Sequence, residues 1–164
     1  MENNVARPRP LTERPASAAL ADSGPLFDVW QWDQELYDGS STTFEVLSCR
    51  DTVLVLPLTG NSEVLLAREA QPVVVERLHS FGGRIEAGED PSAAAQRELS
   101  EELGVHAERL ALWAAWQPLS KIDWAVYLFW AGGLTNSAAS EPDPGERIAI
   151  RDGATQCRAF LLDS

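Results

Sequence analysis

Apolar and polar positions follow each other in short runs along most of this chain, a pattern typical of β-strands. Turn signals such as Asp38-Gly39 and Gly60-Asn61 separate the runs, since glycine there tolerates positive φ. Residues 53–58 are almost continuously apolar, which favours a strand buried on both faces. We expect strands within residues 26–36, 42–48, 53–58, 64–67, 110–116 and 124–131, with weaker runs at 148–150 and 157–162.

One segment has the pattern of a helix. Asp90 is placed to cap its first N–H groups, Pro91 lies where a missing N–H is harmless, and Gly104 is placed to end it. The spacing predicts a helix over residues 91–103. A mixed sheet packed by at least one helix follows, so we expect an α/β (α+β) fold.

Length and composition indicate one globular domain. The chain has 164 residues, 45% of them hydrophobic and 23% charged. Residues 1–25 hold four of the ten prolines and no periodic pattern, so we expect a disordered tail there and a folded domain over residues 26–164. No apolar run approaches the ~20 residues that span a bilayer, so we expect no membrane partner. Cys49 and Cys157 lack metal-type spacing, and we expect two free thiols in a cytoplasmic protein.

The charge balance bears on possible partners. The formal net charge is −12, from 13 basic and 25 acidic residues. A duplex-binding protein normally presents a basic face, so we expect no nucleic-acid partner. An acidic protein that handles phosphates neutralises them locally, usually with divalent cations.

Three glutamates lie on one face of the expected helix. Because successive helical residues turn by about 100°, Glu101 lies about 60° from Glu98 on one side and Glu102 about 40° on the other. Such a cluster is either a solvated acidic face or a site for a hard divalent cation with oxygen ligands. Ala95, Leu99 and Leu103 occupy the adjoining arc and are expected to hold the helix on the sheet.

The residues before the helix favour the cation site. Gly82 and Gly83 allow the backbone to approach a ligand closely. Gly83 is followed at fixed spacing by Glu89 and then by the run Arg97-Glu98-Leu99-Ser100-Glu101-Glu102-Leu103-Gly104-Val105. These residues match every fixed position of the Nudix box, Gly-x5-Glu-x7-Arg-Glu-U-x-Glu-Glu-x-Gly-U, with U apolar. The chain resembles a Nudix hydrolase.

The resemblance implies an α/β/α sandwich around a mixed sheet. This sequence departs from the family pattern at its C-terminal end, where we expect the usual helix to be short or missing. It also implies hydrolysis of a nucleoside diphosphate linked to a second moiety. In that pattern Glu98, Glu101 and Glu102 bind Mg²⁺, for which Mn²⁺ can substitute, with the Gly83 carbonyl as a further ligand. Arg97 and Glu89 orient the cluster through charge-assisted hydrogen bonds.

The flanking segments resemble the ADP-ribose and nucleotide-sugar pyrophosphatase branch over about residues 26–162. In that pattern Arg68 contacts a phosphate, although as a plain surface arginine it needs no explanation. Glu146 is our candidate for the general base or an extra metal ligand, with a turn residue as the other interpretation and Glu141 and Asp143 as weaker candidates. Trp32, or else Trp30, stacks on a base or ribose if it is not a core residue.

Three functions remain open from the sequence. The first is a hydrolase of ADP-ribose or a nucleotide sugar. The second is a house-cleaning hydrolase of nucleoside triphosphates or dinucleoside polyphosphates. The third is a non-catalytic nucleotide sensor, against which the complete set of box carboxylates argues. The expected partners are thus a small nucleoside diphosphate derivative and a second copy of the chain in a homodimer. Either that second copy or the segment of residues 26–36 covers an apolar face of the sheet.

Overall fold

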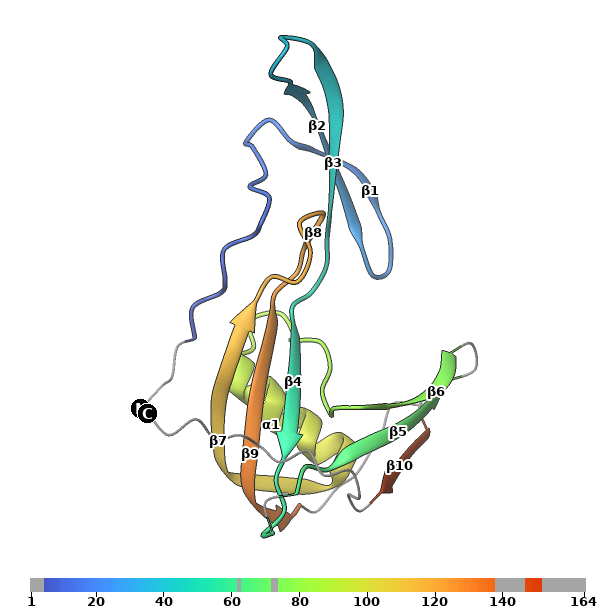
Figure 1. The fold of residues 1–164 in the computed structure, drawn as a ribbon, viewed down its shortest axis with the longest axis vertical. Coiled ribbons are helices and arrows are strands. Elements are labelled where there is room, and N and C mark those ends of the chain that lie inside the picture. Colours follow the sequence, from blue (N-terminus) through green and yellow to red (C-terminus); the bar gives the residue numbers. More distant parts are fainter. Residues whose placement is uncertain (1–4, 62, 72–73, 138–146, 152–164) are drawn as a thin grey trace.

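The computed structural model describes residues 5–61, 63–71, 74–137 and 147–151, which form strands and a single helix (Figure 1). The side chains of residues 68–77 and 147–151 lie outside this description. The strands form three sheets. Two of them combine parallel and antiparallel pairs, and the third is antiparallel. The helix packs on one of the two mixed sheets. The predicted α/β (α+β) class is confirmed.

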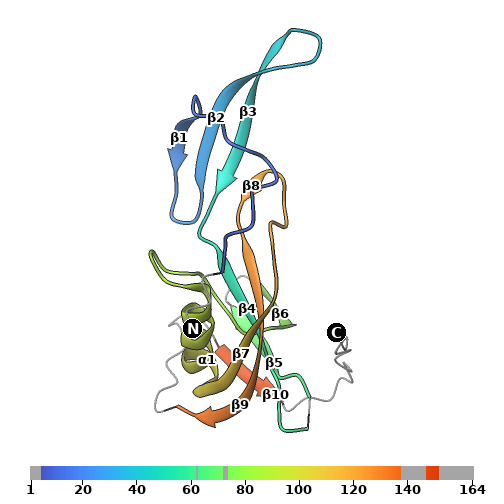
Figure 2. The same cartoon turned by 90° about the vertical axis from the view of Figure 1, so that its left-hand side faces the viewer.

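The first sheet has the order β1-β2-β3-β8. It contains β1 (Ala19–Ser23), β2 (Asp28–Glu35), β3 (Ser41–Ser48) and β8 (Ile122–Asp123). The β2–β3 hairpin turns at Gly39, whose φ of 81° matches the predicted turn. Figures 1 and 2 show this sheet extending away from the helix.

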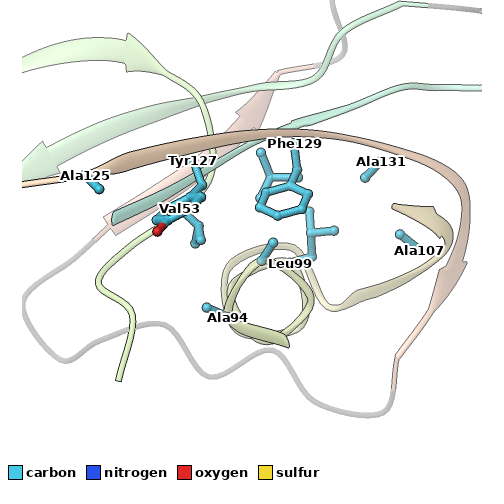
Figure 3. Close-up of a cluster of buried hydrophobic side chains, with 10 residues drawn as sticks. Val53, Ala94, Leu99, Ala107, Ala125, Tyr127, Phe129 and Ala131 are labelled. Atoms are coloured by element: carbon cyan, nitrogen blue, oxygen red, sulfur yellow. The ribbon is translucent and has the colours of Figure 1, made fainter. Parts of the chain in front are cut away.

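The second sheet carries the helix and has the order β4-β9-β7. It contains β4 (Thr52–Pro57), β9 (Val126–Asn136) and β7 (Val105–Trp116). Strands β4 and β9 are parallel, and β9 and β7 are antiparallel. Val53 from β4, Phe129 from β9 and Leu99 from the helix meet in the buried core (Figure 3).

A third sheet of order β10-β5-β6 completes the described structure. It is antiparallel and contains β5 (Leu66–Gln71), β6 (Val74–His79) and β10 (Arg147–Arg151). The apolar run at residues 148–150 predicted β10, whereas β6 was not expected from the pattern.

The helix α1 spans Pro91–Leu103, as predicted. Asp90 caps it by accepting a hydrogen bond from the backbone N–H of Ser92 at 2.8 Å. Gly104 ends it in the left-handed region at φ 65°, where its N–H donates to Ser100 O at 3.0 Å. The predicted capping residues, Asp90 and Gly104, thus fix the two ends of the helix.

The N-terminal segment differs from the expected disordered tail. Ala19–Ser23 forms β1, which pairs with β2 through backbone hydrogen bonds that need no apolar pattern. For this part of residues 1–25 the prediction was wrong. The domain boundary at residue 26 stays a prediction, and the short or missing C-terminal helix concerns residues 152–164, outside the described part.

In the part of the chain that the structure describes, no helix combines the length and apolar character needed to cross a bilayer.

Candidate active site

The glycine pair before the helix is fixed against β4. Val53 N–H donates to Gly83 O at 2.9 Å, and Val55 N–H donates to Phe81 O at 2.7 Å. A third bond runs in the opposite direction, from Ile85 N–H to Asp51 O at 2.8 Å. Residues 81–85 therefore lie along the edge of β4 like an additional short antiparallel strand.

Both glycines are required by their surroundings. Gly82 has φ +138° and lies so close to the carbonyl of Val53 that a Cβ would overlap it. A Cβ on Gly83 would overlap the carboxylate of Glu98. The Gly82 N–H donates to Glu102 Oε2 at 2.9 Å. The backbone at the glycine pair thus contacts two carboxylates of α1 directly.

Arg97 is the centre of the charged network. Its Nε and Nη2 donate to the two oxygens of Glu89 at 2.9 and 3.1 Å. Its Nη1 donates to Glu98 Oε1 at 2.8 Å and to Glu101 Oε2 at 2.9 Å. Nη2 also donates to the carbonyl of Arg84 at 3.0 Å. One guanidinium therefore joins the loop before α1 to two of the three glutamates.

The same network sets the electrostatics of the loop. The two hydrogen bonds from Arg97 hold the pKa of Glu89 below its ordinary value, and the N–H of Glu86 adds to this effect. The pKa of Arg97 is raised, first by its bonds to Glu89 and then by Glu98 and Glu101, against the opposing effect of burial. Both groups are charged at neutral pH, and Glu98 is only 8% exposed.

The residues fit a hard divalent cation by their chemistry. Glu98 lies against Gly83, and Glu102 lies on the N–H of Gly82, so carboxylate oxygens collect at the glycine pair. The Gly83 carbonyl accepts one hydrogen bond, from Val53, and keeps a second lone pair. All of these donors are oxygens, the ligands that Mg²⁺ prefers.

The carboxylates of the described residues are not arranged around a common point as they would be around a bound cation. Among them, no three side chains of His, Cys, Asp or Glu converge as a metal group. Arg97 Nη1 bonds both Glu98 and Glu101, so a cation that takes these carboxylates competes with the guanidinium for their oxygens. The arginine keeps the carboxylates close in spite of their mutual repulsion.

The structure separates Trp32 from this site. Trp32 lies on β2 in the first sheet, is 6% exposed and packs at 5.5 Å, ring centre to ring centre, against Phe44. Its Nε1 donates to Gln34 Oε1 at 3.1 Å. Trp30 on the same strand donates to Ser48 Oγ at 3.0 Å. In this chain both indoles belong to the first sheet, whereas α1 packs on the second (Figure 1).

The remaining predicted residues are described only in part. Arg68 lies on β5, paired with Leu78 of β6 and Ala149 of β10, and its side chain is not described. Glu146 falls outside the described residues, as do Glu141 and Asp143.

Sequence reasoning missed two contributors to the loop. The carbonyl of Asp51 accepts the Ile85 N–H, and the carbonyl of Arg84 accepts from Arg97. Backbone carbonyls carry no signal in the side-chain pattern. Asp51 lies between the strands expected at residues 42–48 and 53–58, and no motif includes it.

Comparisons with known proteins identify the family of this chain. The model of the NUDIX domain matches residues 49–153. The ADP-ribose pyrophosphatase of Bacillus subtilis (strain 168) is 27% identical over 157 residues, which cover 94% of this chain and 85% of that protein. The methanol dehydrogenase activator of Bacillus methanolicus is 27% identical over 126 residues, with 74% and 68% covered.

A solved structure supports the fold. The crystal structure of an ADP compounds hydrolase superposes with a TM-score of 0.69 at 22% identity, covering 85% of this chain and 78% of that one. The family match includes the glycine pair, Arg97 and the three glutamates. The chain therefore belongs to the Nudix family and is a Nudix hydrolase.

Proposed function

We propose that this enzyme hydrolyses the pyrophosphate bond of ADP-ribose or a related nucleotide sugar, with Mg²⁺ as its cation and Mn²⁺ as a substitute. The observation that carries the proposal is the Arg97 network, which holds Glu98 and Glu101, next to the glycine pair, which lies against Glu98 and bonds Glu102. The similarity over 94% of the chain to an ADP-ribose pyrophosphatase supports the substrate class.

In this proposal Glu98, Glu101, Glu102 and the carbonyl of Gly83 are the metal ligands. Glu102 keeps one oxygen on the Gly82 N–H, which fixes the direction of its carboxylate. The two glycines lack a Cβ, so the backbone lies close enough for the Gly83 carbonyl to share the site with Glu98.

Arg97 and Glu89 are positioning residues in this scheme. Their paired hydrogen bonds tie the loop of residues 84–90 to α1. A cation held by these carboxylates would supply positive charge to the diphosphate and would lower the pKa of a water molecule. We assign the general base to Glu146 and phosphate contacts to Arg68. Trp32 is buried against Phe44 in the first sheet, so we assign it no stacking contact.

The proposal extends to a cytoplasmic homodimer. Leu112, Trp113 and Trp116 on β7 are 37%, 60% and 37% exposed. Apolar side chains gathered on one strand favour an interface between protein chains. Sedimentation of the purified chain over a range of concentrations tests the dimer, and a monomer at all concentrations would contradict it.

A substrate panel tests the activity. The chain is incubated with Mg²⁺ and ADP-ribose, nucleotide sugars, NADH, CoA, dinucleoside polyphosphates or nucleoside triphosphates. ADP-ribose is expected to yield AMP and ribose 5-phosphate, and omission of the cation is expected to stop the reaction. Cleavage of triphosphates alone would favour a house-cleaning role. Tight binding of one compound without cleavage of any would favour a sensor.

A further inference from the structure

The N-terminal segment of residues 5–12 is attached to the catalytic part at several points. Thr12 Oγ1 donates to Ser120 O at 2.5 Å, and the Gln117 amide donates to Pro8 O at 3.3 Å. Val5 packs against the core cluster beneath α1. In Figure 2 this segment is the dark blue trace that leads from near the start of β4 up towards the first sheet.

Arg7 makes the strongest of these attachments. Its Nε and Nη2 donate to Asp51 Oδ2 and Oδ1 at 2.7 and 2.9 Å, as a bidentate pair. Its Nη2 lies 2.8 Å from Asp123 Oδ1. The hydrogen bond to Asp51 is the main reason why the pKa of Arg7 is raised. Without Arg7, the carboxylates of Asp51 and Asp123 would lose the guanidinium that both share.

Asp51 connects this ion pair to the box. Its Oδ1 accepts the Ala125 N–H at 2.8 Å, and its backbone carbonyl accepts the Ile85 N–H at 2.8 Å. The Ile85 bond is the first of the three that hold residues 81–85 on β4, and the next involves the Gly83 carbonyl. The position of Asp51 therefore determines where the loop after Gly83 begins.

A shallow pocket of about 300 Å³ lies at this junction, lined by Arg7 and Asp51 together with Ile85 and Glu86. The side chain of Ile85 packs against the core cluster, and its backbone N–H is held by the Asp51 carbonyl. The hydrogen bond to Asp51 therefore sets the backbone position of the residue whose side chain anchors the loop to the core.

We propose that Asp51, held by Arg7 of the N-terminal segment, is a positioning residue for the metal-binding loop. This inference rests on the proposed function, because it takes Gly83 and α1 as the metal site. The path runs from the Arg7 guanidinium through the Asp51 carboxylate and carbonyl to the Ile85 N–H and on to Gly83. Two of the steps are hydrogen bonds, and short covalent stretches within Asp51 and from Ile85 back to Gly83 join them, so the segment acts on the site through geometry and contacts no substrate.

The test combines two measurements on the full chain, both well below the melting temperature of every variant. The first is Mn²⁺ binding without substrate, followed by electron paramagnetic resonance. The second is hydrogen exchange of the Ile85 amide, followed by NMR. Arg7→Ala and Asp51→Asn are expected to weaken Mn²⁺ binding about tenfold, the lower end of what outer-shell partners contribute. Both are also expected to make the Ile85 amide exchange faster.

Two further variants sharpen the result. Arg7→Lys keeps the charge but loses the bidentate geometry, so it is expected to restore part of the Mn²⁺ affinity. Arg9→Ala removes the same charge from an exposed position in the same segment and is expected to behave as the wild type. A fall of melting temperature in Arg7→Ala with unchanged Mn²⁺ affinity or unchanged Ile85 exchange would overturn the inference, because Arg7 would then only stabilise the fold.

The proposed function can fail separately. A wild-type chain that neither binds Mn²⁺ nor cleaves any member of the panel would contradict the proposed function. In that case the Ile85 exchange still decides whether Arg7 holds the loop.

Discussion

Arg97 donates two hydrogen bonds to the carboxylate of Glu89, from Nε at 2.9 Å and from Nη2 at 3.1 Å. This pair joins the end of the loop to the second turn of α1, and it leaves Nη1 directed at Glu98 and Glu101. One guanidinium therefore holds the loop and the carboxylate face of the helix together.

Arg97→Lys is expected to lower kcat/KM about 10- to 100-fold, the range typical of outer-shell partners. A lysine ammonium is a point charge and cannot bond Glu89 with two nitrogens while it also bonds Glu98 and Glu101. Steady-state kinetics with saturating Mg²⁺ measure the effect. Arg109→Lys on β7 is the matched control and is expected to leave kcat/KM near the wild-type value. Equal kcat/KM values for Arg97→Lys and Arg109→Lys would contradict a positioning role for Arg97.

Gly83→Ala is expected to reduce activity while the chain stays folded. The new Cβ would overlap the carboxylate of Glu98, which is the flexible end of its side chain and can move away. The displaced carboxylate would weaken cation binding, so the Mg²⁺ concentration for half-maximal rate should rise. Gly60→Ala is the control, because nothing lies within 4 Å of a Cβ there. An unchanged Mg²⁺ dependence of Gly83→Ala would show that Glu98 does not bind the cation.

Gly82→Ala is expected to act differently, by destabilising the fold. Its Cβ would overlap the backbone of β4 at Val53, and its φ of +138° is unfavourable for alanine. Urea unfolding should show a lower free energy of unfolding for Gly82→Ala than for Gly83→Ala. The reverse order would contradict the close approach of the loop to β4.

Glu102→Gln is expected to lower kcat by about two orders of magnitude or more, since a charged ligand of a catalytic cation contributes several kcal/mol. The fold should persist, because the glutamine oxygen can still accept the Gly82 N–H. Circular dichroism checks the fold and single-turnover kinetics check the chemical step. A near-normal rate would contradict the assignment of Glu102 as a metal ligand.

The Glu89–Arg97 pair is expected to make stability depend on acid pH. The pKa of Glu89 lies below its ordinary 4.5 in the folded chain, chiefly because of Arg97. A group with a lowered folded-state pKa contributes stability above its unfolded pKa and loses it as the pH falls through the folded pKa. Urea unfolding of the wild type and Glu89→Gln should therefore differ most at about pH 7 and progressively less towards about pH 3. A constant difference would mean that the charge of Glu89 is not what stabilises the pair.

The helix and its chemistry were predictable because their signals are local. Asp90, Pro91 and Gly104 mark the ends of α1 through the backbone geometry that each favours, and the predicted bounds match the observed ones. The common face of Glu98, Glu101 and Glu102 follows from the helical repeat alone.

The surroundings of the helix were less predictable because they depend on contacts distant in sequence. The ion pair of Arg7 with Asp51 joins residues 44 positions apart, and the sequence around each residue contains no motif that predicts it. The strand Ala19–Ser23 could not be predicted, because β1 is exposed along its whole length and its sequence has no alternation of apolar and polar residues. The surroundings of Trp32 could not be predicted for a different reason. A tryptophan in a strand gives the same sequence pattern whether its ring packs on another side chain, here Phe44, or on a ligand.

The parallel pairing of β4 with β9 has a consequence for the way the chain folds. The bond between Asp51 and Ala125 joins residues 74 positions apart, and the whole box lies between them in sequence. Parallel pairs of this kind close large loops and form slowly, because chain entropy is lost before the contacts are gained. The box segment can thus become helical early, but the strand edge that fixes its glycines exists only once β9 has been made and docked. We expect hydrolytic activity to return only with the slowest phase of refolding. We also expect it to be missing from chains truncated before the end of β9.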